Sequence, residues 1–187
     1  MKIKSLISLS ILIFTTTFSL YGQNIIKPKN GYSDQIGTTI SMMEDLKQRI
    51  YSSVGNLSLE ETDFLLDDEA NRIGALILHL AATEKYYQVY TFENRGLNAE
   101  ERAIWDIAQN LGDKGREQIK GKPIDYYMNI WDEVRKESLA LLKTKDDKWF
   151  ASKVKGSSMN NHWAWYHVME HQANHMGQIR LILKRAN

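Results

Sequence analysis

The segment His167-Val-Met-Glu-His171-Gln-Ala-Asn-His175-Met-Gly-Gln178 repeats a histidine at every fourth residue. Each residue turns an α-helix by about 100°, so residues four apart stack on one of its faces. The spacing therefore predicts a helix that carries paired imidazoles on one side. Two such imidazoles, those of His171 and His175, can bind one transition-metal ion and leave coordination positions for further ligands.

Three further stretches of the chain have apolar residues at three- and four-residue spacing, which predicts amphipathic helices. The first stretch covers residues 34–54, and the second runs from about Asp68 to Phe92. The third opens at Pro123 and keeps its apolar stripe as far as Leu141. The histidine-rich helix is the fourth, from about residue 161 to 184.

Shorter signals lie between these stretches. Two capping boxes, Ser58 with Glu61 and Asn98 with Glu101, predict short helices, the second of them between Glu100 and Leu111. The glycines that follow predict a loose connection up to Pro123, and the polar residues 145–159 predict a loop. Since no segment shows a period of two, the predicted fold class is all-α, a four-helix bundle with short connecting helices.

The N-terminus has the pattern of an export signal. A basic start at Lys2 and Lys4 precedes an uncharged apolar stretch from Leu6 to Leu20. This stretch is shorter than the roughly 20 apolar residues of a spanning helix. We expect a signal peptide at 1–22, a tail at 23–33 and one domain at 34–187, exported to the periplasm or secreted and without a membrane span after signal removal. An uncleaved N-terminal anchor is the alternative.

Composition narrows the possible functions. The chain contains no cysteine, which excludes disulfides, thiolate metal ligands and a lipid anchor on cysteine. Without residues 1–22, the chain has 22 basic and 23 acidic side chains, a formal charge of −1. This balance gives no electrostatic footprint for nucleic acid.

A third histidine, His79, lies beside the apolar stripe of the second long helix. With His171 and His175 it can form a three-histidine site inside the bundle, where side chains from facing helices converge. The alternative for His79 is a hydrogen-bonded core histidine. Neutral imidazoles suit a divalent transition metal, with zinc or nickel favoured and iron next. Each step of four residues rotates the helix face by about 40°, so we expect His167 to line the site rather than bind the ion.

Two common metal enzymes do not fit the sequence. A zincin needs HExxH with glutamate as the general base, and here Gln172 follows His171. Di-iron carboxylate bundles need Glu-x-x-His motifs, and the chain has none.

Three stretches together, Asn71–Glu84, His167–Ile179 and Leu57–Phe64, resemble the DinB/YfiT-like superfamily of metalloenzymes. The resemblance covers most of residues 34–186. It implies a four-helix bundle with one divalent metal held by three histidines, which by position are His79, His171 and His175. Relatives include thiol-dependent S-transferases and a mycothiol-dependent isomerase, in which the metal activates a low-molecular-weight thiol. Homodimers are common among them.

The chain departs from the family pattern at a few positions. Gln172 stands where family members often have glutamate, and Asn174 and Met176 stand where many carry a second histidine. The function predicted is a metal-dependent enzyme, of transferase or hydrolase type, whose ion activates a bound water or a thiol. One alternative is a non-catalytic metal-binding or interaction protein of the cell envelope. In such a protein, His167 would be a fourth ligand that blocks the open coordination position of the metal. Another is a bundle whose histidines bind nothing. The sequence assigns no catalytic residue.

Overall fold

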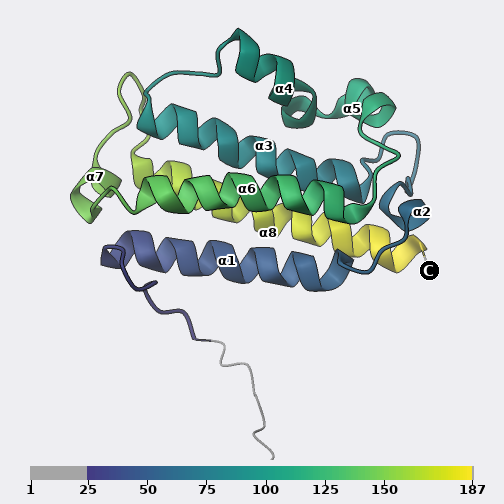
Figure 1. The fold of residues 1–187 in the computed structure, drawn as a ribbon, viewed down its shortest axis with the longest axis horizontal. Coiled ribbons are helices and arrows are strands. Elements are labelled where there is room, and N and C mark those ends of the chain that lie inside the picture. Colours follow the sequence, from purple (N-terminus) through teal and green to yellow (C-terminus); the bar gives the residue numbers. More distant parts are fainter. Residues whose placement is uncertain (1–24, 187) are drawn as a thin grey trace, which may run out of the picture.

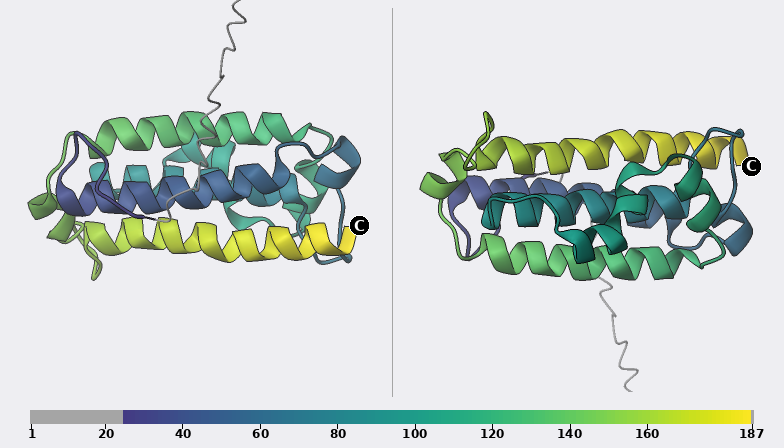
Figure 2. Two further views of the ribbon diagram at one scale, coloured as in Figure 1. Left: turned by 90° about the horizontal axis from the view of Figure 1, so that it is seen from below. Right: turned by 90° about the horizontal axis from the view of Figure 1, so that it is seen from above.

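Four long helices lie side by side in the computed structural model, which describes residues 25–186 (Figures 1 and 2). They are α1 (Asp34–Val54), α3 (Ile73–Phe92), α6 (Ile124–Leu142) and α8 (Asn161–Ala186). Within the described range the regular structure is helical, apart from an isolated bridge between Lys153 and Asn160. The predicted all-α four-helix bundle is thereby confirmed. The predicted signal peptide at 1–22 lies outside the described residues.

The long helices run in two directions. Helices α1 and α8 point one way along the bundle, and α3 and α6 point the other way (Figure 1). Two short helices, α4 (Ala99–Asn110) and α5 (Gly112–Gln118), run along the outer side of α3 and carry the chain back to the end where α6 begins (Figure 1). Helix α8 packs against both α1 and α3, so the last helix faces the second long helix as the histidine pattern requires.

The core consists of two apolar clusters. Its largest fully buried side chains are Trp131 and Tyr127 in one cluster and Trp165 and Phe150 in the other. Burying a large apolar side chain contributes roughly 1.5–3 kcal/mol, so these residues dominate the packing energy. The predicted stripe of α1 is buried at every position, namely Ile36, Ile40, Met43, Leu46, Ile50 and Val54.

Both capping boxes form. Ser58 and Glu61 close the start of α2 (Leu59–Thr62), and Asn98 and Glu101 close the start of α4. Each pair satisfies two backbone N–H groups that the first turn of a helix leaves without partners. Among the described residues, no helix has both the length and the apolar character needed to cross a bilayer.

The second long helix starts later than predicted. Helix α3 begins at Ile73, not near Asp68, because the backbone of Arg72 is extended. The Arg72 guanidinium instead donates to the backbone oxygens of Asp63, at 3.0 Å, and Arg116, at 2.5 Å. These bonds tie the segment before α3 to neighbouring turns.

Two segments predicted to be irregular are helical. Residues 112–118 form α5, because Leu111 adopts a positive φ of 53° that ends α4 and lets a new helix start at once. Part of the predicted loop 145–159 forms α7 (Asp147–Ala151), where the Asp146 side chain accepts from the Trp149 N–H and Phe150 is fully buried.

Candidate metal centre

Three histidines from two helices meet at one point. The Nε2 atom of His171 lies 2.8 Å from Nε2 of His79 and 3.0 Å from Nε2 of His175. One ligand atom from each ring lies within 4.8 Å of those of the other two. The predicted convergence of a single imidazole on α3 with a pair on α8 is therefore present. That these side chains bind a metal stays a prediction.

Hydrogen bonds at the far side of two rings fix their orientation. The Nδ1–H of His79 donates to the backbone oxygen of Ala108 at 2.8 Å, and the Nδ1–H of His175 donates to Oε1 of Gln178 at 3.1 Å. A carbonyl oxygen can only accept, so the proton of each neutral ring sits on Nδ1. Both Nε2 atoms then present a lone pair to the centre of the cluster, which is the usual arrangement of metal-binding histidines.

This donor set fits a cation. Three imidazole nitrogens face one another, and at most the Nε2 of His171 can donate a proton to a neighbour. The remaining lone pairs have no donor among the three rings. Nitrogens bound at 2.0–2.1 Å to one ion, with angles of 90–110°, lie about 2.8–3.4 Å apart. The two short Nε2 separations, 2.8 and 3.0 Å, are close to that spacing.

The surroundings keep the three rings neutral. Burial, together with the neighbouring imidazoles of His175, His79 and His167, lowers the pKa of His171 to about 3. Burial and His79 lower the pKa of His175 to about 4. Burial also lowers the pKa of His79, although nearby backbone carbonyls oppose the shift. The unprotonated form that binds metals is therefore the form present near pH 7.

The remaining described histidines lie outside the cluster. The ring of His167 is 5.6 Å from that of His171, stacks on Trp163 and pairs through Nδ1 with Glu170 Oε2 at 3.2 Å. His167 thus lies next to the cluster but outside it, and its role in lining the site stays a prediction. His162 stacks on Phe150.

Two carboxylates near the histidines in sequence do not contact the three clustered imidazoles. Glu84 is fully buried and accepts from Arg135, Trp131 and Ser138, while Glu170 pairs with His167. The group that orients His79 is the backbone oxygen of Ala108 on α4. A backbone acceptor leaves no side-chain signal in the sequence, so sequence reasoning missed it. Gln178, one turn beyond His175, contacts that ring directly.

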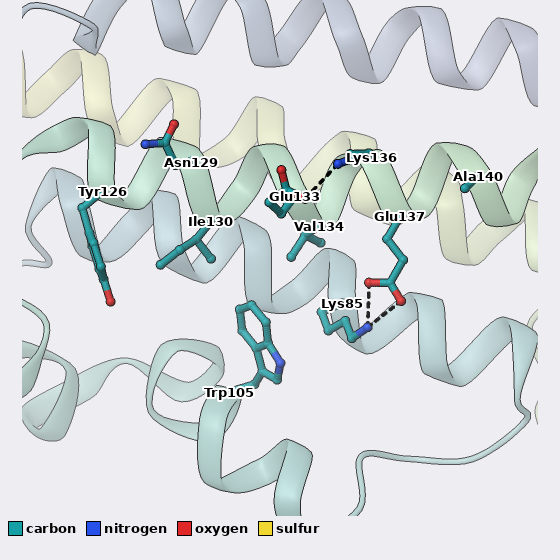
Figure 3. A pocket seen from close by; sticks show the side chains of 10 residues that line it. All are labelled: Lys85, Trp105, Tyr126, Asn129, Ile130, Glu133, Val134, Lys136, Glu137 and Ala140. Carbon is teal, nitrogen blue, oxygen red and sulfur yellow. Dashed lines mark hydrogen bonds and ion pairs between the residues drawn. The ribbon is translucent and has the colours of Figure 1, made fainter.

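A groove of about 740 Å³ lies between α4 and α6 (Figure 3). Trp105 points into it from α4, facing Ile130 and Val134, and the Lys85–Glu137 ion pair lies at one end (Figure 3). No histidine lines this groove. We therefore locate the candidate chemistry at the nitrogen cluster and not at this hollow.

Comparison with known proteins supplies the family. A search of curated proteins finds no match. The family model described as mycothiol-S-transferase matches residues 39–185, a range that contains all three clustered histidines. The match covers well over half of the chain, and the chain belongs to the mycothiol-S-transferase family, within the DinB/YfiT-like superfamily.

Proposed function

We propose that this protein is a metal-dependent S-transferase that uses a low-molecular-weight thiol as a substrate. The observation that carries the proposal is the meeting of three Nε2 atoms from α3 and α8. Membership of a family named for transfer to mycothiol supports the thiol as the substrate class.

His79, His171 and His175 would hold one divalent ion, for which zinc or nickel is favoured and iron is the next choice. When bound, such an ion lowers the pKa of a coordinated thiol or water and so supplies a nucleophile near neutral pH. The protein's own contribution is to hold the imidazoles in place. Ala108 and Gln178 fix two ring orientations, and burial keeps the rings unprotonated.

Three protein ligands leave room for a substrate, whereas a purely structural site is closed by a fourth. The envelope-protein alternative requires His167 as that fourth ligand. His167 is instead engaged by Trp163 and Glu170, and no other histidine, aspartate or glutamate of the described chain joins the group. The open arrangement favours catalysis over a closed binding site.

Export through a signal peptide at 1–22 and assembly as a homodimer remain predictions. Removal of the first 22 residues is checked by N-terminal sequencing of the protein recovered from its native host. Light scattering of the purified protein gives the subunit number.

The function is tested with purified full-length protein. Elemental analysis is expected to find one divalent ion per chain. A panel of low-molecular-weight thiols with electrophilic acceptors should give thioether products, and chelation should abolish their formation. A protein that binds no stoichiometric metal, or whose turnover is indifferent to a chelator, would refute the proposal.

A further inference from the structure

Four polar side chains, one from each long helix, meet around a buried guanidinium, three of them buried and the fourth, Glu44, partly exposed at the edge of the core. Arg135 of α6 is 3% exposed and lies at their centre. Its Nε donates to Glu84 Oε1 at 2.7 Å and its Nη2 to Glu84 Oε2 at 2.9 Å. Its Nη1 donates to Glu44 Oε1 at 2.6 Å. The guanidinium therefore joins α6 to α3 and to α1.

Gln172 brings α8 into the same network. Its side chain is 1% exposed. In the amide orientation that satisfies both of its polar groups, its oxygen accepts from Arg135 Nη2 at 2.6 Å and its nitrogen donates to the Met43 backbone oxygen at 3.1 Å. A neutral amide can accept and donate at the same time, whereas an ionised carboxylate at this position could only accept. The residue that replaces the glutamate of a zincin is thus a cross-link between helices.

The network lies beside the histidine cluster along both helices. Gln172 directly follows His171, and Glu84 is five residues after His79, about 7.5 Å farther along α3. Glu84 also accepts from Trp131 Nε1 at 3.0 Å and from Ser138 Oγ at 2.6 Å, so α6 holds it in place from several sides. Arg135 thereby fixes α3 and α8 to a common point near the imidazoles.

Metal sites tolerate little displacement. Sliding α3 past α8 by one residue would move His79 by about 1.5 Å, whereas metal–ligand distances hold to within ~0.2 Å. Apolar contacts are non-directional and resist such sliding only weakly. Hydrogen bonds are directional, and breaking these would leave a buried charge without its partner. The polar network is the part of the core that can define axial position this closely.

We propose that Glu84, Arg135 and Gln172 are positioning residues for the candidate metal centre. They hold α3 and α8 in the axial register that brings His79 Nε2 to the His171–His175 pair. None of the three contacts the nitrogens that would bind the ion. The inference rests on the proposed function, because it takes the three histidines to be metal ligands.

Cobalt binding to the full-length protein tests the proposal, since Co²⁺ reports both affinity and ligand geometry through its visible absorption. Two variants remove the network's link to α8: Gln172→Met, and the paired replacement Glu84→Leu with Arg135→Met. The paired replacement avoids an unpaired buried charge, which Arg135→Ala alone would leave. We expect both variants to keep the helical circular dichroism of the wild type. Their Co²⁺ affinity should fall at least tenfold, with a changed visible spectrum.

The control is Ile182→Ala, a buried apolar position of α8 that belongs to the same core. It should lower stability yet keep the wild-type cobalt affinity and spectrum. Folded network variants with wild-type affinity and spectrum would overturn the positioning role and leave the proposed function standing. Wild-type protein that binds no Co²⁺ would overturn both. If the paired variant does not fold, Gln172→Met decides alone.

Discussion

At the scale of single residues, His171 is the decisive side chain, because its Nε2 is within 3.0 Å of both other imidazole nitrogens. We expect His171→Ala to lose its metal on dialysis, while His162→Ala, whose ring stacks on Phe150, keeps it. Binding to the native state alone stabilises a protein by about 2.7 kcal/mol when free metal exceeds Kd a hundredfold. Thermal unfolding with and without metal measures this difference. Coincident holo and apo curves for the wild type would contradict the assignment.

Replacing Gln178 tests how much its hydrogen bond to His175 contributes to metal affinity. Because Gln178 is exposed, its replacement should leave the fold intact. Gln178→Leu removes the acceptor for His175 Nδ1–H, and loss of such outer partners typically costs 10–100-fold in metal affinity. Gln178→Glu keeps an acceptor and should stay within a few-fold of the wild type. Competition titration with a chromophoric chelator gives both affinities. Equal affinities for the Leu and Glu variants would show that the hydrogen bond is unimportant.

The sequence predicts the imidazoles of this site but not all that surrounds them. Four-residue spacing places His171 and His175 on one face, and a position beside an apolar stripe brings His79 inward. The Ala108 oxygen had no such signal, because every residue carries a carbonyl and only the path of α4 selects one. Glu84 follows His79 on the same helix, yet its partner is a buried arginine from a helix distant in sequence.

At the scale of elements, two glycines in helices should respond oppositely to alanine. A Cβ at Gly74 would lie 2.4 Å from Tyr127 Cε2, where α3 and α6 pack closely. Gly74→Ala should destabilise by about 1–3 kcal/mol through overpacking. A Cβ at Gly177 meets nothing within 4 Å, so this residue does not serve close packing. Gly177→Ala should stabilise by up to ~1 kcal/mol through helix propensity. Urea unfolding measures the change in the free energy of unfolding for both variants. Changes of the same sign would contradict the packing argument.

The elements that the sequence predicts best are those with local signals. Apolar periodicity gives the bounds of α1, and capping boxes give the starts of α2 and α4. Helix α5 has no such signal: it depends on the positive φ of Leu111, a conformation that sequence reasoning assigns to glycine. Helix α7 is five residues long and depends on burying Phe150 against the bundle. Apolar periodicity in the sequence does not predict short helices that depend on tertiary contacts.

At the scale of the whole molecule, the polar network of Glu84 and Arg135 spans the bundle and should make its stability depend on acid. Burial raises the pKa of Glu84, but the ion pair with Arg135 and hydrogen bonds from Arg135, Ser138 and Trp131 outweigh it, so the pKa lies below its ordinary 4.5. A carboxyl whose pKa is lowered by folding stabilises the native state above the unfolded-state pKa. That contribution is lost as pH falls through the folded-state value.

The free energy of unfolding of the metal-free protein should already fall below pH 6.5, because the buried imidazoles resist protonation in the native state. Through Glu84 we expect it to fall further as pH decreases below about 4.5. Glu84→Gln should be less stable at pH 7, because Arg135 loses its buried counter-charge, yet its stability should change less steeply with acid. Glu133→Gln, at an exposed position of α6, should follow the wild-type slope. Urea unfolding followed by circular dichroism from pH 7 to pH 3 measures the three slopes. A Glu84→Gln slope equal to that of the wild type would mean that other titrating groups, and not this network, govern the acid stability of the bundle.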